Sequence, residues 1–315
     1  MSKEKPFSIS QWTVLEAWKH VKANKGAAGV DEVSIEQFEQ DWKNRLYKLW
    51  NRMSSGSYFP SPVLGVEIPK KAGGRRLLGI PTVEDRVAQM TVRLAFEPLV
   101  EPKFHENSFG YRPKRSALDA VGLTRQRCWK YDWVIELDIK GLFDNIDHSL
   151  LMRVVKKHTQ DRWVVLYIER WLKVPILMPN GELKERKAGT PQGGVISPVL
   201  ANLFLHYAFD RYMEVMFAGV PWVRYADDAV IHCRTEQEAQ EILRRLHTRM
   251  HSCKLELHLR KTRIVYCKDK DRKGAYPNTE FDFLGYTFRG RWIKDRLGRI
   301  QCNFIAAVSD EAIQA

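Results

Sequence analysis

Hydrophobic residues recur every three or four positions in several long segments, which is the spacing of an amphipathic helix. The segments expected to be helical are Ser10 to about Asn24, Val33 to Met53, Thr82 to Leu99, Ser116 to Trp129, Ser149 to His158, Arg162 to Leu172, Pro198 to Ala218 and Glu236 to Cys253. In the first of them Trp12, Leu15 and Trp18 mark the expected buried face. Thr82 is expected to cap the third helix, with Asp85 as its capping-box partner.

Shorter apolar runs bounded by turn residues indicate strands. The expected strands are Val63 to Pro69, Arg75 to Ile80, Trp133 to Asp138, a hairpin from Pro175 to Lys187 and a strand-turn-strand from Trp222 to Cys233. A glycine-containing turn from Lys71 to Gly74 joins the first two, and Asn180-Gly181 favours a tight primed turn in the hairpin. This mixture predicts an α+β protein, with a small antiparallel sheet covered by helices.

The charge of the chain indicates a polyanionic partner, either nucleic acid or an anionic membrane surface. Its 315 residues carry a formal net charge of +13, and the 44% hydrophobic content predicts a packed fold. The membrane is disfavoured because no apolar run approaches the roughly 18 residues of a spanning helix, and the start of the chain lacks a signal peptide. The cysteines are scattered without metal-ligand spacing, which predicts reduced thiols in a cytoplasmic protein.

Two adjacent aspartates, Asp227 and Asp228, lie between apolar strand residues in Tyr225-Ala226-Asp227-Asp228. A tight hairpin would present both carboxylates at its tip, where they repel each other unless a divalent cation lies between them. An isolated Asp-Asp pair is more often a solvated turn. The pattern therefore needs a second signal before it indicates a metal site.

That second signal is Asp138, which ends the expected buried strand and could face the hairpin tip. Asp138 and Asp227 would then offer oxygen ligands to two hard cations, for which Mg²⁺ is the expected choice. Two such ions roughly 3.5–4 Å apart can activate a primer 3′-hydroxyl and stabilise a leaving pyrophosphate. For Asp144 and Asp147 the preferred interpretation is capping at a helix start.

These segments resemble motifs A and C of reverse transcriptases, and the chain around them resembles the proteins encoded by bacterial group II introns. The further segments that carry this likeness are Ile68-Pro69-Lys70 with Leu78-Gly79-Ile80-Pro81 (fingers hairpin), Ser108-Phe109-Gly110-Tyr111-Arg112-Pro113 with Arg115-Ser116, Gly189-Thr190-Pro191-Gln192-Gly193-Gly194 with Ser197-Pro198 (motif B) and Phe283-Leu284-Gly285-Tyr286 (motif E). Together the segments span about Ala27 to Phe288 in the order of the family. Their joint occurrence is specific, although each alone would be weak.

The resemblance implies the fingers and palm of a right-hand polymerase. The expected ranges are 1–131 for an N-terminal extension and the fingers, 132–290 for the palm with a fingers-side helical and hairpin insertion at about 149–188, and 291–315 for a short basic tail. The chain is expected to be a fragment that ends before the thumb. The tryptophans Trp12, Trp18, Trp42 and Trp50 are expected in the core rather than as base-stacking platforms.

The resemblance also implies a role for each matching residue. The catalytic carboxylates would be Asp138, Asp227 and Asp228, and the metal ions would be held by these together with Ile139. The nucleotide-binding residues would be Lys70 and Arg76 on the triphosphate, Phe143 under the incoming sugar, Gln192 at the nucleotide or template base, and Lys261 as a proton donor to pyrophosphate or a plain phosphate contact. The residues expected along the nucleic acid are Arg112, Lys114, Arg115, Arg260, Arg263, Leu284 and Gly285. Phe143 could instead be an ordinary core residue.

The implied activity is an RNA-directed DNA polymerase that copies intron RNA into cDNA for retrohoming, with a maturase role in a longer protein. The implied partners are group II intron RNA, an RNA template with a DNA primer, dNTPs and, for a longer protein, target DNA. Two Mg²⁺ ions are expected, with Mn²⁺ as a substitute; no membrane partner is expected, and a homodimer is left open. The alternatives are a CRISPR-associated or retron reverse transcriptase and an RNA-binding maturase without polymerase activity. A viral RNA polymerase, which usually has Gly-Asp-Asp and a polar residue in place of Phe143, is disfavoured.

Overall fold

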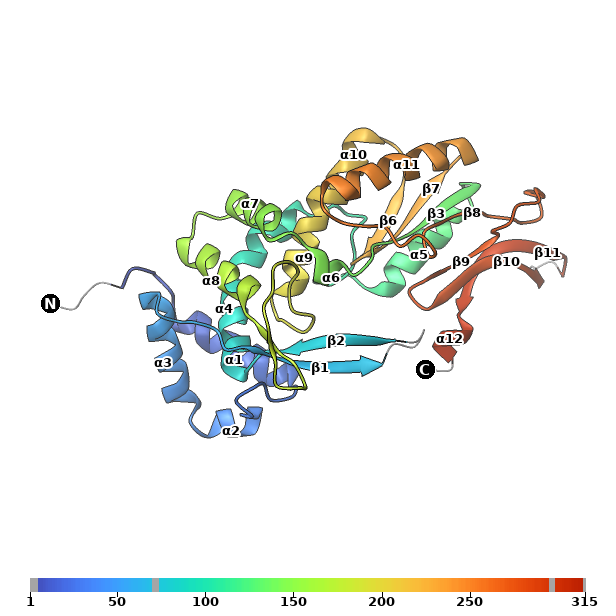
Figure 1. Cartoon of the computed structure of the whole chain (residues 1–315). Helices are drawn as coiled ribbons and strands as arrows, with labels where there is room; N and C mark the ends of the chain where they lie inside the picture. Colours follow the sequence, from blue (N-terminus) through green and yellow to red (C-terminus); the bar gives the residue numbers. More distant parts are fainter. Residues whose placement is uncertain (1–4, 70–73, 295–297, 314–315) are drawn as a thin grey trace. The chain divides into compact units, whose positions relative to one another are not determined.

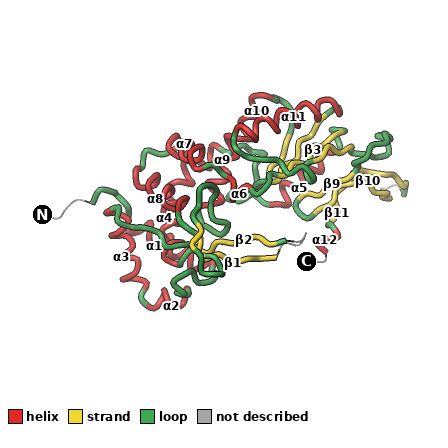
Figure 2. The backbone as a smooth tube through the Cα atoms, viewed as in Figure 1, coloured by secondary structure: helices red, strands yellow, loops and turns green. Residues whose placement is uncertain are grey.

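The computed structural model describes residues 5–69, 74–294 and 298–313. It divides into two compact units, and each unit is made of two separate stretches of chain. The first unit comprises Met1–Lys103 and Phe143–Phe204, and the second comprises Phe104–Leu142 and Leu205–Ala315. Helices predominate in the first unit, whereas most strands belong to the second (Figures 1 and 2).

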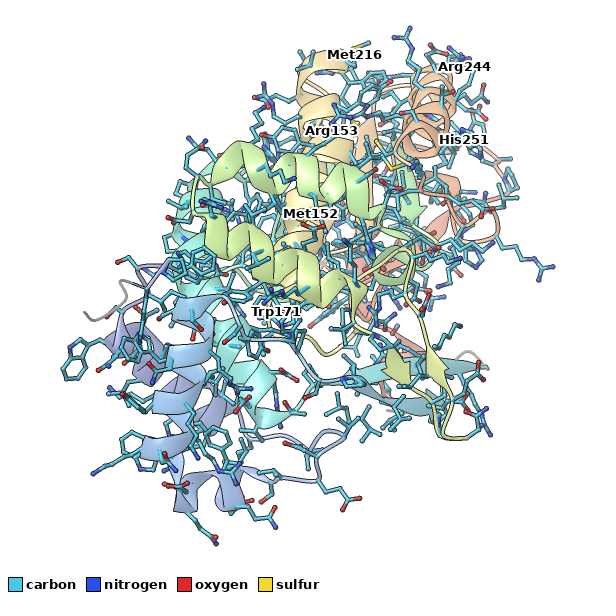
Figure 3. All side chains as sticks on the ribbon, turned by 60° about the vertical axis from the view of Figure 1, so that its left-hand side comes forward. Met152, Arg153, Trp171, Met216, Arg244 and His251 are labelled. Carbon is cyan, nitrogen blue, oxygen red and sulfur yellow. The ribbon has the colours of Figure 1, made fainter. Side chains whose placement is uncertain are left out.

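Several helices of the first unit begin at a residue whose side chain caps the helix. They are α1 (Gln11–Asn24), α2 (Ile35–Gln40), α3 (Trp42–Ser55), α4 (Val83–Val100), α6 (Leu142–Asn145), α7 (His148–His158), α8 (Arg162–Lys173) and α9 (Ser197–Leu205), with a 3-10 turn at Glu101–Lys103. Ser10 accepts a hydrogen bond from the backbone N–H of Trp12, and Thr82 accepts one from that of Asp85. In α7 the buried Met152 alternates with the exposed Arg153, and Trp171 of α8 is buried as well (Figure 3).

Two predictions about the amino-terminal helices are wrong. The segment expected to be one helix is divided into α2 and α3, because Asp41 between them has the non-helical angles φ −131° and ψ 32°. Trp12 is 78% exposed, and of the other tryptophans expected in the core Trp18 is buried while Trp42 and Trp50 are half-buried. Helix α1 contacts α4, and its buried residues are Val14, Ala17, Trp18 and Val21, so only Trp18 of the predicted face is buried.

A buried carboxylate joins α4 to the loop before the first strand. Asp85 accepts hydrogen bonds from the Tyr58 hydroxyl, the Ser61 N–H and the Thr82 hydroxyl. The predicted capping box would also require the Asp85 carboxylate to accept from the backbone N–H of Thr82. It is not complete, because the carboxylate accepts from these three other donors instead. Trp171 extends the network by donating from Nε1 to the Tyr58 hydroxyl at 3.3 Å. Burial raises the pKa of Asp85 to about 6.

The sheet of the first unit contains the predicted hairpin. Its strands are β1 (Val63–Pro69), β2 (Arg75–Ile80), β4 (Ile176–Leu177) and β5 (Leu183–Lys184), in the order β2-β1-β4-β5. Strands β1 and β2 are antiparallel, with Ile68 opposite Arg76, and β1 pairs with β4 in parallel. The second predicted hairpin is also confirmed, since β4 and β5 pair around a turn closed by the Gly181 N–H on the Met178 carbonyl.

The central sheet of the second unit is antiparallel throughout and has the strand order β6-β7-β3-β8. Its strands are β3 (Trp133–Asp138), β6 (Trp222–Tyr225), β7 (Asp228–Cys233) and β8 (Arg263–Tyr266). The helices of this unit are α5 (Ala117–Cys128), α10 (Arg211–Met216) and α11 (Glu236–Ser252). Helix α11 packs along the sheet (Figure 1). A π-helical turn at His206–Asp210 interrupts the predicted long helix and separates α9 from α10.

A second sheet follows in the order β11-β10-β9. Its strands are β9 (Glu280–Phe283), β10 (Tyr286–Lys294) and β11 (Ile300–Val308), and a short helix α12 (Asp310–Ile313) comes after them. The expectation of a mere tail after Gly290 is wrong, because β10 runs on to Lys294 and pairs with β11 over its whole length. Phe304 of β11 is fully buried, so this hairpin contributes to the core of the unit.

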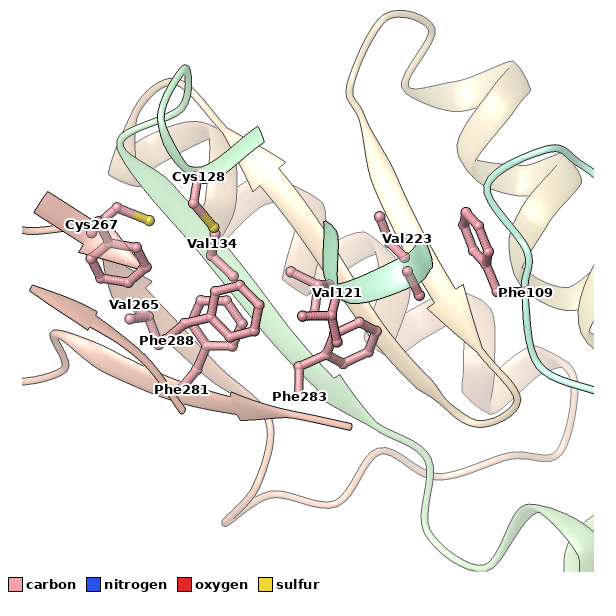
Figure 4. Close-up of a cluster of buried hydrophobic side chains, with 13 residues drawn as sticks. Phe109, Val121, Cys128, Val134, Val223, Val265, Cys267, Phe281, Phe283 and Phe288 are labelled. Carbon is pink, nitrogen blue, oxygen red and sulfur yellow. The ribbon is translucent and has the colours of Figure 1, made fainter. Parts of the chain in front are cut away.

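That core joins the two sheets and α5. Valines from all four central strands, namely Val134, Val223, Val230 and Val265, belong to one cluster with Phe281, Phe283, Phe288 and Phe304 (Figure 4). The Phe281 and Phe288 rings stack at 4.7 Å between centroids. Along β3 the same face continues through Glu136 to Asp138, since alternate residues share a face. The apolar face of the sheet therefore becomes acidic at one end.

The chain shows neither disulfides nor a membrane-spanning helix in the part that the structure describes. All five cysteines are free thiols, and only Cys302 is not fully buried. None of the helices described here combines the length and the apolar character that crossing a bilayer requires.

Candidate active site

Three aspartates meet at the acidic end of the central sheet in the second unit. Asp138 is the last residue of β3, Asp228 is the first of β7, and the two are direct partners in the antiparallel register. Such partners project to the same face of a sheet. Asp227 lies in the two-residue turn between β6 and β7, next to Asp228. The predicted strand end and hairpin are thus confirmed, and the catalytic role of the carboxylates stays a prediction.

The environment of Asp227 and Asp228 disfavours the ionised forms of their carboxylates. Burial, followed by the charges of Asp227 and Asp138, raises the pKa of Asp228 to about 7. Burial also raises the pKa of Asp227, with the charge of Asp138 as a further cause. Lys261 Nζ lies 3.1 Å from Asp138 Oδ2, and this hydrogen bond raises the pKa of the lysine. Three carboxylates therefore crowd beside one lysine, which leaves an excess of negative charge.

The chemistry of this group fits a hard divalent cation, because carboxylate oxygens are the ligands that Mg²⁺ prefers. Like charges directly opposite each other in a sheet are destabilising unless something compensates them. Among the described residues, however, no three acidic, histidine or cysteine side chains already converge as a complete metal-binding group. Asp138 is instead hydrogen-bonded to Lys261. Ile139, the other predicted ligand, is buried, forms an isolated β-bridge with Leu257 and has only its backbone carbonyl to offer a cation.

The tip of the hairpin has a defined backbone conformation. Ala226 adopts the left-handed region with φ 54°, which an alanine rarely does. Gly110 lies against this turn so closely that a Cβ atom on it would be 2.3 Å from the backbone nitrogen of Ala226. Glycine at position 110 is therefore required by the close approach of two backbone segments.

The first unit brings a second group of predicted residues together. The Thr190 N–H donates to the Phe143 carbonyl at 2.7 Å, and Gln192 Nε2 donates to Asp144 Oδ2 at 3.3 Å. The Gly79 N–H, on strand β2, donates to the Gln192 carbonyl at 2.7 Å. The half-buried Phe143, the loop that carries Gln192 and the β1–β2 hairpin are therefore connected through their backbones.

Glycines make these connections sterically feasible. Gly189 has φ +79°, and a Cβ atom there would be 2.4 Å from the Phe143 carbonyl oxygen. Gly193 has φ +116°, and a Cβ atom there would be 2.5 Å from the Gly79 carbonyl oxygen. The sequence suggested that glycine next to Gln192 lets backbone approach nucleic acid. In the structure the approach at Gly193 is to the protein's own strand β2.

Of the two predicted triphosphate contacts, only Arg76 belongs to the described residues. Arg76 is exposed on β2, opposite Ile68. Its neighbour Arg75 is paired with Glu67 at 2.6 Å. Lys70 lies outside the described residues.

Comparison with protein families now decides the class of this chain. The family described as "Reverse transcriptase (RNA-dependent DNA polymerase)" matches residues 68–288, well over half of the sequence. The chain belongs to the reverse transcriptase family. The matched range contains the three aspartates of the second unit and the Phe143–Gln192 group of the first.

Individual relatives agree with this membership. The group II intron-encoded protein LtrA of Lactococcus lactis subsp. cremoris is 36% identical over 193 residues, which cover 60% of this chain and 32% of LtrA. Protein YkfC of Escherichia coli is 31% identical over 304 residues, which cover 82% of this chain and 78% of YkfC. This reverse transcriptase thus spans only about a third of the length of LtrA. The resemblance to group II intron proteins is confirmed.

The fold agrees with that of a solved polymerase. A telomerase from Candida tropicalis matches with a TM-score of 0.55 at 13% identity, over 73% of this chain and 53% of that one. At this identity the likeness shows fold alone. The predicted α+β architecture of a right-hand polymerase is confirmed.

The residues that this reverse transcriptase was predicted to place along nucleic acid differ in their surroundings. Arg112 donates to the His105 and Ser108 carbonyls, and Arg263 binds Glu136 through two nitrogens. Lys114 and Arg260 are exposed, and Arg115 donates from Nη1 to the Glu106 carbonyl. Leu284 and Gly285 form the β9–β10 turn, with φ angles of 52° and 79°. Two left-handed residues in a two-residue loop form a primed turn. All these nucleic-acid contacts stay predictions.

Of the two aspartates predicted to cap helices, Asp147 does so and Asp144 does not. Asp147 caps α7 by accepting a hydrogen bond from the Leu150 N–H at 2.9 Å, as predicted. Asp144 is not a cap, because it lies inside α6 and its carboxylate accepts from Gln192. The capping prediction for Asp144 is therefore wrong, since a residue far away in the sequence occupies its side chain.

Sequence reasoning missed contacts next to the predicted residues in each of the two units. In the second unit Arg224, on strand β6 of the hairpin that carries Asp227, forms a fully buried ion pair with Asp210. His148 Nε2 lies 2.7 Å from the Gly189 carbonyl oxygen, next to the loop that carries Gln192. A signal for Arg224 exists in the sequence, since a charged residue within the apolar strand of Trp222 and Val223 needs a buried partner.

Proposed function

We propose that this chain is an RNA-directed DNA polymerase of a group II intron, which copies intron RNA into cDNA for retrohoming. The observation that carries the proposal is the cross-strand pair of Asp138 and Asp228, with Asp227 in the adjoining turn. Reverse transcriptases generally use divalent metal ions. Here we propose two Mg²⁺ ions, with Mn²⁺ as a substitute, which would activate the primer 3′-hydroxyl and stabilise the leaving pyrophosphate.

In the second unit, Asp138, Asp227, Asp228 and the Ile139 carbonyl would hold these ions. Lys261 would bind the leaving phosphates or donate a proton to them, a role supported by its position beside Asp138. A lysine is protonated at neutral pH, as either role requires, and the hydrogen bond to Asp138 raises the pKa of Lys261 further.

In the first unit, Arg76 together with Lys70 would bind the triphosphate through charge-assisted hydrogen bonds. Gln192 would contact the nucleotide or template base, and its backbone link to Gly79 supports action together with the hairpin. Phe143 would lie under the sugar and exclude a 2′-hydroxyl. A rigid ring there offers a ribose hydroxyl neither space nor a hydrogen-bond partner.

The proposed partners follow from the same assignment. They are an RNA template with a DNA primer, dNTPs, group II intron RNA and, in a longer protein, target DNA and a maturase role. Residues 1–131 are proposed as an N-terminal extension and the fingers, and 132–290 as the palm with a fingers-side helical and hairpin insertion at about 149–188. A homodimer is compatible with this proposal, and free buried thiols support a reducing cytoplasmic compartment.

Primer extension on an RNA template with dNTPs and Mg²⁺ tests the proposal. Asp227→Asn removes one negative ligand and is expected to reduce extension below a few per cent of the parent chain, with RNA binding retained. Asp271→Asn, at an exposed aspartate of the same unit, is the matched control and should leave extension unchanged. Substantial extension by Asp227→Asn would refute the assignment. RNA binding without extension by the parent chain would favour a maturase without polymerase activity.

A further inference from the structure

Arg224 is an unusual residue for a central strand, because it is charged and only 1% exposed. Its Nε and Nη2 atoms donate to the two carboxylate oxygens of Asp210, both at 2.7 Å. Nη2 also donates to the Ser108 hydroxyl at 2.8 Å, and Nη1 donates to the Ala226 carbonyl at 2.9 Å. The planar guanidinium thus binds a carboxylate on one edge and the tip of the hairpin on the other.

Asp210 is held as firmly as its partner. It is fully buried and is the last residue of the π-helical turn between α9 and α10. Arg249 of α11 donates to the carbonyls of Tyr207 and Ala208 in this turn. Burial alone would raise the pKa of Asp210, but the charge and hydrogen bonds of Arg224 outweigh it, and the pKa is lowered. The carboxylate therefore stays ionised and gives Arg224 a fixed anchor.

The backbone of the same strand is fixed from the other side. The Arg224 N–H donates to the Asn107 carbonyl at 2.9 Å, and the Phe109 N–H donates to the Arg224 carbonyl at 2.8 Å. The segment then continues to Gly110, which lies against the Ala226 nitrogen. Side-chain and backbone contacts thus converge on Ala226, the residue before Asp227.

A buried ion pair is weak evidence for stability, since packed hydrophobic residues often serve as well. Its geometry here has a more specific use, because one Arg224 nitrogen is committed to the carbonyl of a left-handed alanine. We propose that Arg224, anchored by Asp210, is a positioning residue that fixes the Ala226 peptide and with it the Asp227 carboxylate for metal binding. This inference rests on the proposed role of Asp227. It assigns no chemical step to Arg224.

The test compares Arg224→Lys and Asp210→Asn with Arg272→Lys in the full chain. Arg272 forms a similar, largely buried ion pair with Asp269 and also donates to the Cys128 and Tyr131 carbonyls. These contacts lie before the start of β3, at the end of the strand opposite to Asp138. All three variants are expected to lower the melting temperature.

The discriminating readout is the Mg²⁺ concentration that gives half of the metal-induced rise in melting temperature, with primer extension as a second readout. Arg224→Lys and Asp210→Asn are expected to raise it roughly 10- to 100-fold, the usual effect of removing a residue that orients metal ligands. Arg272→Lys should leave it unchanged. An unchanged Mg²⁺ requirement in Arg224→Lys or Asp210→Asn would overturn the positioning role.

A second pair of variants tests the same idea without removing a buried charge. Gly110→Ala forces the Ala226 nitrogen to move and should raise the Mg²⁺ requirement, whereas Gly122→Ala in α5 meets nothing within 4 Å and should not. Equal Mg²⁺ requirements in this pair would also contradict the proposal. Active Asp227→Asn would refute the proposed function itself. If Asp227→Asn is inactive but the Arg224, Asp210 and Gly110 variants keep the Mg²⁺ requirement of the parent chain, only the positioning role is refuted.

Discussion

The raised pKa of Asp228 makes Mg²⁺ binding depend on pH. With a pKa of about 7, the metal-free protein holds a proton on this carboxyl at pH 6 and has lost it at pH 8. A cation beside Asp228 favours the ionised form, so binding releases a proton below pH 7. The apparent dissociation constant should therefore be roughly tenfold larger at pH 6 than at pH 8, which equals about 1.4 kcal/mol.

The same shift affects the stability of the metal-free protein. Since the pKa of Asp228 is higher in the folded protein than the ordinary value of 3.8, its contribution to stability is complete below that value. The contribution is lost as the pH rises through 7. Without metal, the parent chain should thus lose stability between pH 6 and pH 8 relative to Asp228→Asn, and Mg²⁺ should restore it.

Thermal melts with increasing Mg²⁺ at pH 6 and pH 8 measure both effects. Asp228→Asn removes one proposed ligand and should need more Mg²⁺ at both pH values, but it should lose most of the tenfold pH dependence, because its amide does not titrate. Asp271→Asn should keep the tenfold difference of the parent chain. Equal half-saturation in the parent chain at both pH values, or a tenfold difference that persists in Asp228→Asn, would refute the reasoning.

Three further predictions concern single side chains. Phe143→Val should keep DNA synthesis and admit ribonucleotides far more readily; an unchanged rNTP to dNTP incorporation ratio in a variant with normal melting would show that Phe143 is a core residue. Arg76→Ala should raise the KM for dNTP by the equivalent of about 1.5–3 kcal/mol, whereas the control Arg75→Ala should leave it unchanged. A change in template affinity alone would contradict the assignment of Arg76. His232 is fully buried, and burial lowers its pKa to about 3, so the parent chain should lose about 2 kcal/mol relative to His232→Leu between pH 7 and pH 5 in urea unfolding. Parallel pH profiles of the two proteins would contradict this last prediction.

The sequence by itself determined those elements that local chemistry decides. Strands Val63–Pro69, Arg75–Ile80 and Trp133–Asp138 have the predicted bounds, because alternating or continuous apolar residues end at turn-forming residues. Thr82 and Asp147 cap helices where the sequence predicts them, since a capping bond spans only a few residues. The hairpin that carries Asp227 and Asp228 follows from the same kind of signal, because apolar strand residues lie on both sides of a short turn.

Only the tertiary structure decided which distant residues meet. The sequence predicts that Asp144 caps a helix, yet its carboxylate accepts a hydrogen bond from Gln192. The residues after Gly290 look like a basic tail, yet they form a hairpin with β10, because the buried Phe304 packs with phenylalanines of β9 and β10. Arg224 and Asp210 are separated in the sequence by helix α10 and a turn, and only folding brings them together inside the core. Local patterns encode bonds within a few residues, whereas strand order and buried ion pairs depend on contacts that form once the whole chain has packed.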